Sequence, residues 1–457
     1  MRQMTKQSIP IGRRDNRPLR WTAALLLIAL LFSGPARPNA DAKKNKLYLN
    51  HRSVTLCTGD RVQLKVKGRS RKTGVTWKSG KPKVVSVTKK GLLKAKKTGT
   101  AIVTAKVKGK KLKCKVKVVH PPALNRAKVI LTGGKTFQLK VKHWSKKVTW
   151  KSSRPSVVKV SKTGLLRSVK PGRATVTAKA GGKTLNCDVT IDTPREALLR
   201  QYRATVARST YIVHALGGLD GHTYINSLDG LSKAYASGNR LFEADVSFTS
   251  DDRLVLAHSA SNNIWTQVDW EERLGQPYDP ERPLATFDEF RAFRIQGKYH
   301  ATTFAELLDF MEKHRDMYVM LDAGTRDYDA SRHYYQAVVD TAAGRTDVLD
   351  RFLTGGHTTD MIRAVRETYD FPLMNLYFSS DSVREKALWT PKQFIRYCEK
   401  NGIISFSVSK RVYTEKVATE LNKSDLIAYV FTTNDTGEAK ALRKRGADVI
   451  GSDFLRN

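Results

Sequence analysis

The sequence has few cysteines and lacks the short motifs of several common enzyme classes. Only four cysteines occur in 457 residues, and none forms a Cys-x-x-Cys pair, which argues against thiol redox chemistry and zinc binding. Cys57 and Cys114 fall in one segment and can pair, whereas Cys187 and Cys398 fall in different segments. No Gly-x-Ser-x-Gly elbow occurs. Neither Gly-Lys-Thr sequence follows a glycine at the spacing that a phosphate-binding loop requires.

A hydrophobic run long enough to span a membrane is also missing. The N-terminal apolar run, residues 21–32, has 12 residues, whereas a bilayer needs about 20. Arginines precede this run, and the small-x-small sequence Ala40-Asp41-Ala42 follows it. This pattern predicts a secretory signal peptide over residues 1–42, with an uncleaved anchor as the alternative. We therefore expect a secreted or cell-surface protein with no transmembrane helix after signal cleavage.

Acidic residues are nearly absent from residues 43–193, which hold 41 Lys and Arg against 3 Asp and Glu. Residues 194–457 hold 34 basic and 37 acidic residues, so the net charge of +40 comes from the N-terminal part. So basic a surface predicts an anionic partner. No nucleic-acid-binding motif occurs, so we expect an anionic cell-wall polymer or lipid head groups. The alternative is that the lysines only prevent strands from pairing edge to edge.

The basic part contains a sequence repeat in which three motifs recur at one constant offset. Val-Thr-Trp-Lys-Ser, Gly-Leu-Leu and a cysteine each occur twice, at 75–79 and 148–152, 91–93 and 164–166, and 114 and 187. Each copy has short alternating runs rich in Val and Thr between turn residues, which predicts a small antiparallel β-sandwich. Cys57 has Thr132 as its counterpart, so the second copy cannot form the same disulfide.

The two copies resemble the group 2 bacterial immunoglobulin-like domains, which share the Thr-Trp-x-Ser and Gly-x-Leu motifs. This resemblance implies two immunoglobulin-like domains, at residues 43–121 and 122–194. The motif match is specific evidence for the fold but only weak evidence for what these domains bind.

Strand and helix patterns alternate from residue 195 to the end of the chain. Apolar runs predict eight strands over about 250 residues, the size of a (β/α)₈ barrel, near residues 211, 241, 317, 352, 373, 403, 427 and 448. Thr303 and Glu306 predict a capped helix through Lys313. The predicted fold is multidomain: two all-β immunoglobulin-like sandwiches followed by an α/β (β/α)₈ TIM barrel over 195–457. Residues 260–300 are expected to form an insertion over the barrel mouth.

Polar residues cluster where the first predicted strands of this barrel end. His214 closes the first strand, Glu243 and Asp245 share one face of the second, and His258 follows the next. Two adjacent carboxylates repel unless a proton or cation lies between them, and Ca²⁺ or Mg²⁺ prefers such oxygen ligands. Two imidazoles beside the ion would supply a general acid and a general base. The alternative is that these are ordinary polar residues at strand ends.

The chain from about 203 to 455 resembles the glycerophosphodiester phosphodiesterase family in motif order and spacing. The matching sequences are His214-Ala215-Leu216, Ile225-Asn226-Ser227, Glu243-Ala244-Asp245, His258-Ser259 and the closing Asn434-Asp435. The resemblance implies a TIM barrel in which Glu243, Asp245 and Asp322 bind the divalent metal. It also implies that His214 and His258 are the catalytic pair and that Asn226 orients the substrate or the catalytic loop. The expected activity is a secreted, metal-dependent phosphodiesterase that converts glycerophosphodiesters to a glycerol phosphate and an alcohol.

The sequence lacks two positively charged residues of the family pattern. Ala215 replaces the arginine of His-Arg-Gly, and Asp322-Ala323-Gly324 replaces Glu-x-Lys. Lys410 and Arg326 are candidates to hold the substrate phosphate instead, or they are solvated surface cations. Two alternative functions follow from this loss. One is a phospholipase C-like lyase acting on a lipid or polymer, and the other is a non-catalytic barrel in a cell-wall adhesion protein.

Overall fold

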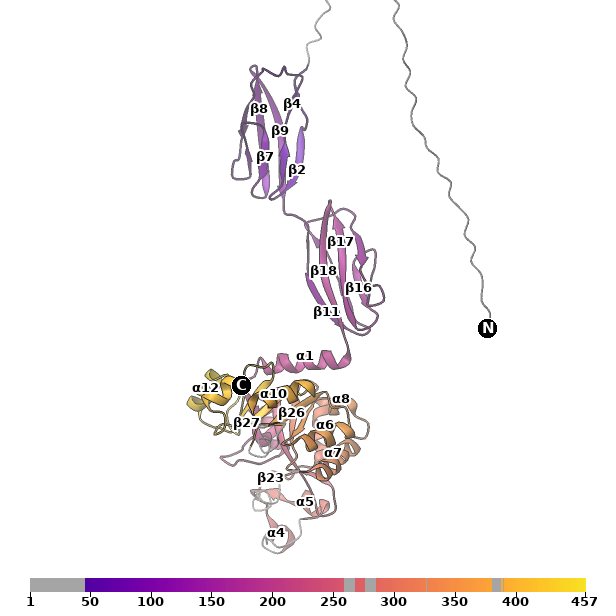
Figure 1. The fold of residues 1–457 in the computed structure, drawn as a ribbon, viewed down its shortest axis with the longest axis vertical. Helices are drawn as coiled ribbons and strands as arrows, with labels where there is room; N and C mark the ends of the chain where they lie inside the picture. The colour runs from indigo at the N-terminus through magenta and orange to yellow at the C-terminus, as the bar shows by residue number, and fades with distance from the viewer. Residues whose placement is uncertain (1–45, 259–267, 276–284, 326, 380–387, 389) are drawn as a thin grey trace, which may run out of the picture. The chain divides into compact units, whose positions relative to one another are not determined.

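The computed structural model describes residues 46–258, 268–275, 285–325, 327–379, 388 and 390–457 (Figure 1). The predicted signal peptide, Arg326 and part of the predicted insertion lie outside these ranges. The chain separates into two units, residues 1–121 and 122–457. No helix among the described residues combines the length and hydropathy needed to cross a bilayer.

The first unit contains the first sandwich. One sheet has the order β2 (Ser53–Cys57), β9 (Lys110–Val119), β8 (Gly99–Val107) and β5 (Thr76–Ser79). The other has the order β3 (Arg61–Gln63), β7 (Leu92–Ala95) and β6 (Val85–Val87), and β1 (Tyr48–Leu49) pairs with β4 (Val66–Lys67). Alternate residues of β8 and β9 are buried between the sheets, as the period of two predicted. The prediction of a wholly antiparallel sandwich is wrong in one place, because β2 pairs with β9 in parallel.

The second sandwich repeats this arrangement strand for strand. Its sheets have the orders β11 (Lys128–Thr132), β18 (Lys183–Asp192), β17 (Gly172–Ala180), β14 (Thr149–Ser152) and β12 (Thr136–Gln138), β16 (Leu165–Ser168), β15 (Val158–Val160). Strands β10 (Ala123–Leu124) and β13 (Val141–Lys142) pair separately. The offset between matching strands is constant from β5 and β14 onward and slightly larger before them. The first copy therefore has two extra residues in the connection before β5.

The repeated tryptophan and glycine form one packing feature in each copy. Gly91 has φ +83° and Gly164 has φ +87°, a region that favours glycine. A Cβ on Gly164 would lie 2.7 Å from the carbonyl oxygen of Leu139 and 2.7 Å from the ring of Trp150. The corresponding Cβ on Gly91 would meet Leu64 and Trp77 in the same way. The two motifs recur together because the indole packs directly against the glycine backbone.

The possible disulfide between Cys57 and Cys114 is not formed, and both cysteines are free. Cys57 lies opposite Val119 in the β2–β9 register, five residues from Cys114 along β9. Five residues of strand span roughly 16 Å, far beyond the ~7 Å limit on the Cα separation of bridged cysteines. Cys114 is buried in the core, whereas Cys57 lies on the opposite face of its sheet.

The second half of the chain forms the predicted closed barrel of eight parallel strands. In spatial order they are β19 (Tyr211–Val213), β29 (Val449–Ser452), β28 (Ile427–Phe431), β27 (Ser405–Ser409), β26 (Leu373–Tyr377), β25 (Phe352–Gly356), β24 (Tyr318–Asp322) and β20 (Leu241–Phe248). The pairing of β19 with β20 closes the ring. All eight correspond to predicted strands.

Helices connect the strands and pack their apolar faces on the outside of the ring. They are α2 (Leu228–Ala236), α6 (Phe304–Lys313), α7 (Tyr328–Ala342), α8 (Thr346–Leu349), α9 (Thr359–Thr368), α10 (Pro391–Lys400), α11 (Glu415–Leu421) and α12 (Thr436–Lys444). The capping box of Thr303 and Glu306 at α6 is confirmed. Helix α1 (Pro194–Val206) packs at the N-terminal ends of the strands, where the Tyr202 hydroxyl contacts that of Tyr429 at 2.5 Å. This packing leaves the C-terminal ends for the site.

Strand β21 (Leu254–Leu256) precedes His258 and is not one of the eight barrel strands. It runs antiparallel to the end of β20, with Val246 opposite Leu256. Part of the expected insertion follows, with helices α4 (Trp270–Leu274) and α5 (Phe287–Ala292) and strands β22 (Arg294–Ile295) and β23 (Tyr299–His300). Phe290, Phe293 and Ile295 give this segment its own small core.

Candidate active site

The predicted carboxylates lie side by side at the C-terminal ends of neighbouring strands. Asp245 of β20 is directly opposite Asp322, the last residue of β24, in the parallel register. Glu243 lies two residues earlier on β20 and is also buried. His214 immediately follows β19, which pairs with β20. Four predicted residues from three strands therefore share one end of the barrel, where TIM-barrel active sites occur.

His258 reaches the same place although it does not follow one of the eight barrel strands. Because β21 runs back along β20, a residue just past Leu256 returns alongside Asp245. One ligand atom each from Asp245, His258 and Asp322 lies within 4.8 Å of the others. A divalent cation with ligands at about 2.3–2.6 Å fits among donors at such separations. The Nδ1 of His258 is buried and has no hydrogen-bond partner among the described residues, as expected where a ligand completes the site.

The electrostatics of this cluster favour a cation. Burial is the main cause that raises the pKa of Glu243 to about 8. The positive charge of His214 lowers this pKa, whereas the negative charges of Asp245 and Asp322 raise it. Burial followed by repulsion from Asp322 also raises the pKa of Asp245. Near neutral pH Glu243 therefore retains its proton unless a positive charge replaces it. Oxygen donors of this kind fit Ca²⁺ or Mg²⁺.

A carboxylate that the sequence analysis missed orients His214. The Nδ1 of His214 lies 2.8 Å from Oδ1 of Asp453, and Asn434 donates to the other oxygen of Asp453 at 2.9 Å. Burial alone would lower the pKa of His214, but this hydrogen bond and the charges of Glu243 and Asp245 raise it to about 9. Since Asp453 engages Nδ1, the Nε2 atom remains for substrate. The only sequence signal for Asp453 was its position just after the last strand.

The side chain of Asn226 contacts Asp245 at both ends. Its Nδ2 donates to Oδ2 of Asp245 at 2.7 Å, and its Oδ1 accepts from the Asp245 backbone N–H at 3.1 Å. Asn226 itself has φ +46° and is fully buried. It therefore fixes the direction of one predicted metal ligand, and its predicted contact with substrate stays a prediction.

Tyr224 is a second residue that the sequence analysis missed. Its ring lies between the two imidazoles, with centroid distances of 4.8 Å to His214 and 5.3 Å to His258, both edge-on. Burial, followed by the charges of nearby carboxylates, raises the pKa of its hydroxyl. Tyr224 therefore separates the two histidines and remains protonated near neutral pH.

Lys410, one predicted phosphate-binding cation, is paired with a carboxylate. Its Nζ lies 2.7 Å from Oε2 of Glu438, which also accepts from the hydroxyl of Thr433. Lys410 does follow β27, at the predicted end of the barrel. Its role with substrate stays a prediction, as does that of Arg326, which lies outside the described residues.

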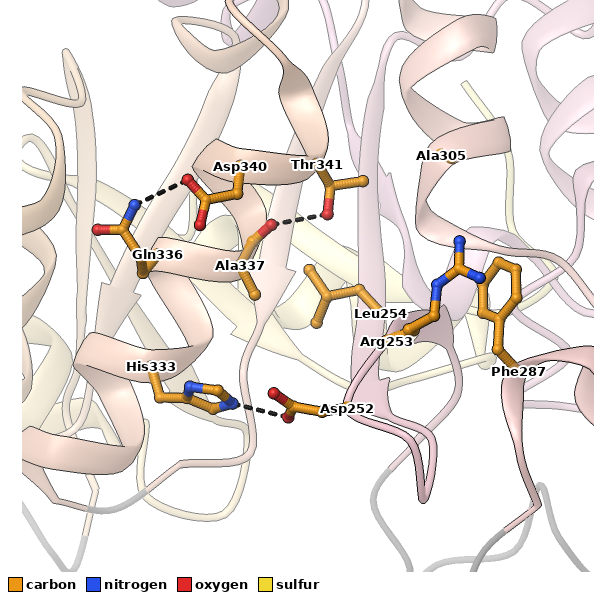
Figure 2. Close-up of a pocket in the computed structure, with 10 residues that line it drawn as sticks. All are labelled: Asp252, Arg253, Leu254, Phe287, Ala305, His333, Gln336, Ala337, Asp340 and Thr341. Atoms are coloured by element: carbon orange, nitrogen blue, oxygen red, sulfur yellow. Dashed lines mark hydrogen bonds and ion pairs between the residues drawn. The ribbon is translucent and has the colours of Figure 1, made fainter.

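A pocket on the outside of the barrel contains none of the predicted site residues. It has a volume of about 310 Å³ and is lined by residues of β21 and its preceding turn, α5, α6 and α7 (Figure 2). The Nε2 of His333 lies 2.7 Å from Oδ1 of Asp252 there, and Arg253 lies over the ring of Phe287. The carboxylate and histidine cluster is therefore separate from this pocket.

Comparisons with known proteins address the family and the fold. The model of the glycerophosphoryl diester phosphodiesterase family matches residues 218–457, and that of the bacterial Ig-like domain (group 2) matches residues 118–189. His214 lies just before the first of these ranges. A search of curated proteins found no match.

Solved structures of three bacterial proteins are similar to about half of the chain. A phosphodiesterase from Oleispira antarctica, in complex with the product sn-glycerol-3-phosphate, is 15% identical over 54% of this chain and 93% of its own, with a TM-score of 0.42. A glycerophosphoryl diester phosphodiesterase from Parabacteroides distasonis is 18% identical over 57% and 88%, with a TM-score of 0.42. A glycerophosphodiester phosphodiesterase from Thermotoga maritima is 18% identical over 54% and 95%, with a TM-score of 0.38.

The family model matches more than half of the chain, including most of the barrel and all three predicted metal-binding carboxylates. On this evidence the chain belongs to the glycerophosphoryl diester phosphodiesterase family, a family of phosphoric diester hydrolases.

Proposed function

We propose that the protein is a metal-dependent phosphodiesterase that hydrolyses glycerophosphodiesters, or polymers and lipids containing glycerophosphate, to a glycerol phosphate and an alcohol. The observation that carries this proposal is the cluster of Asp245, His258 and Asp322 at the C-terminal strand ends. Neighbouring His214, held by Asp453, supplies a second imidazole. Family membership supports the same reaction class.

Glu243, Asp245 and Asp322 would hold the Ca²⁺ or Mg²⁺ ion. When bound, such an ion polarises the phosphoryl oxygens and lowers the pKa of a substrate hydroxyl beside the phosphate. One histidine takes the proton of that hydroxyl, and the other gives a proton to the leaving alcohol oxygen. Asp453 favours protonated His214, which suits it as the first acid, and His258 then acts as the first base. The hydroxyl oxygen attacks phosphorus as the alcohol leaves, which gives a cyclic phosphate. In the second step the histidines exchange roles, and water opens the ring to give the glycerol phosphate.

The other parts of the proposal rest on the sequence. Residues 1–42 are a signal peptide, residues 43–121 and 122–194 are the two immunoglobulin-like domains, and residues 195–457 are the catalytic barrel. The protein acts outside the cell, where its basic sandwiches meet an anionic wall polymer or lipid head groups. Lys410 or Arg326 compensates for the alanine at position 215.

Purified protein should be tested on glycerophosphodiesters before and after treatment with EDTA, with Ca²⁺ or Mg²⁺ restored. We expect release of a glycerol phosphate that EDTA abolishes and added metal restores. His214→Ala and His258→Ala should each lower kcat by at least about a hundredfold, because each removes a proton-transfer group. His333→Ala is the matched control, since His333 lies in the outer pocket. Activity that survives EDTA and both substitutions would refute the proposal.

A further inference from the structure

The two sandwiches differ in charge although they share one fold. Residues 43–121 hold 25 Lys and Arg and a single acidic residue, Asp60, whereas residues 122–193 hold 16 basic and two acidic residues. Six of the 25 basic residues lie on the outward side of the sheet β2-β9-β8-β5. We call this surface the lysine face and define it by six exposed residues: Lys78, Lys106, Lys111, Lys113, Lys115 and Lys117.

Four of these lysines form a straight row on one strand. β9 alternates exposed lysines with the buried residues Cys114, Val116 and Val118. Side chains two residues apart on a strand share a face, so successive ammonium groups are anchored about 6.8 Å apart. In the register with β8, Lys111 lies opposite Lys106, which places a fifth positive charge beside the row.

The strands beside this row, β2 and β8, contain no acidic residue. The outward neighbours of the row on these strands are Ser53, Thr55, Thr100, Ile102 and Thr104, besides Lys106. Like charges at adjacent positions on a sheet are destabilising. The repulsion between these lysines therefore destabilises the first sandwich, and no acidic residue on β2 or β8 offsets it.

The second sandwich shows that the fold does not need these lysines. Their four counterparts on β18 are Thr184, Asn186, Asp188 and Thr190. Protection against edge-to-edge pairing does not explain the row either, because β9 lies between β2 and β8 in the interior of its sheet. The remaining explanation is an anionic partner.

We propose that the lysine face binds a linear phosphodiester polymer whose phosphates are joined by three-carbon bridges, of the poly(glycerol phosphate) type. Successive phosphorus atoms in such a polymer are six bonds apart, as are equivalent atoms two residues apart in polypeptide. Extended, both therefore repeat at about 7 Å, so one phosphate can meet each lysine of the row. Exposed Ile102, opposite Lys115, offers an apolar contact to the carbon bridges.

The row that four of the six lysines form on β9 distinguishes this partner from a lipid surface. Head groups on a membrane are spread in two dimensions, so any cluster of basic residues can bind them. A linear polymer binds most strongly where the positive charges lie in one line. Binding here would hold the protein on the polymer and raise the concentration of phosphodiester near the barrel. The inference concerns binding alone and holds whether or not the barrel cleaves the polymer.

The test uses the full chain carrying His214→Ala, so that the polymer stays intact, and measures binding to immobilised poly(glycerol phosphate) at several salt concentrations. The face variant replaces the four lysines of the row by threonine, which two of the second-sandwich counterparts already are. The charge-matched control replaces four exposed lysines elsewhere on the same sandwich: Lys81, Lys83, Lys89 and Lys90.

We expect the face variant to bind at least tenfold more weakly and with a clearly smaller dependence on salt, because fewer counterions are released. The control should lose less than threefold. Two double variants, Lys111→Thr with Lys113→Thr and Lys115→Thr with Lys117→Thr, should each give an intermediate loss, and cooperative thermal unfolding verifies their folding. Equal losses in face variant and control would overturn the proposal. So would tighter binding to phosphatidylglycerol vesicles or to duplex DNA at equal phosphate concentration.

Discussion

Removal of the metal should make the barrel sensitive to pH in a direction that the buried carboxyls determine. The pKa of Glu243 is raised from 4.5 to about 8, and that of His214 from 6.5 to about 9. Both groups bind more protons in the folded than in the unfolded state. Their stabilising contributions are therefore complete below pH 4.5 and 6.5 respectively. They are lost as the pH rises through about 8 and about 9.

The size of the effect follows from these values. Between pH 5 and 8, Glu243 alone should lower the free energy of unfolding of the metal-free protein by up to roughly 1.4 kcal/mol per pH unit. At pH 7 about nine tenths of the Glu243 side chains are protonated, so metal binding should release at least about 0.9 proton per protein molecule. Apparent metal affinity should therefore increase with pH up to about 8.

Calorimetric titration with Ca²⁺ in buffers of different ionisation enthalpy measures the protons released. Thermal unfolding in EDTA between pH 5 and 9 measures the stability. Glu243→Gln serves as the comparison, since it should remove most of the proton release and raise the melting temperature of the metal-free protein above pH 8. Metal binding at pH 7 without proton release would refute the electrostatic account of the cluster.

Three further predictions concern single contacts. Asp453→Asn should lower the pKa of His214, which would shift the pH profile of kcat to lower pH and reduce its maximum, measured by steady-state kinetics. Asn226→Ala should weaken Ca²⁺ binding about 10- to 100-fold in calorimetry with the fold intact, because a carboxylate ligand loses its orienting partner. Gly164→Ala should destabilise the second sandwich by about 2–4 kcal/mol in denaturant unfolding. Gly182→Ala, also at positive φ but with open space around its Cβ, should cost clearly less, and equal losses would contradict the packing explanation.

The sequence predicted those parts of the molecule that depend on local patterns. All eight barrel strands follow from apolar runs, and Glu243 and Asp245 were placed on one face by the period of two. The strand repeat of the sandwiches was likewise visible in the recurring Trp, Gly and Cys motifs. Family membership, expected from motif order, is confirmed by the family model.

Other features depend on contacts that no local pattern contains. Asp453 reaches His214 across 239 residues of sequence, and only closure of the barrel brings them together. The antiparallel direction of β21 is another such feature, because a short apolar run carries no information on whether its neighbour is parallel. The possible Cys57 disulfide failed because strand register, not sequence proximity, sets the Cα separation.

The most direct test of the cation site is anomalous scattering from crystals soaked in Mn²⁺, a metal with similar oxygen ligands. We expect one strong anomalous peak at the strand ends, from an ion bonded to carboxylate oxygens of Glu243, Asp245 and Asp322. A map with no peak there, or with the ion held only by residues outside this cluster, would contradict it.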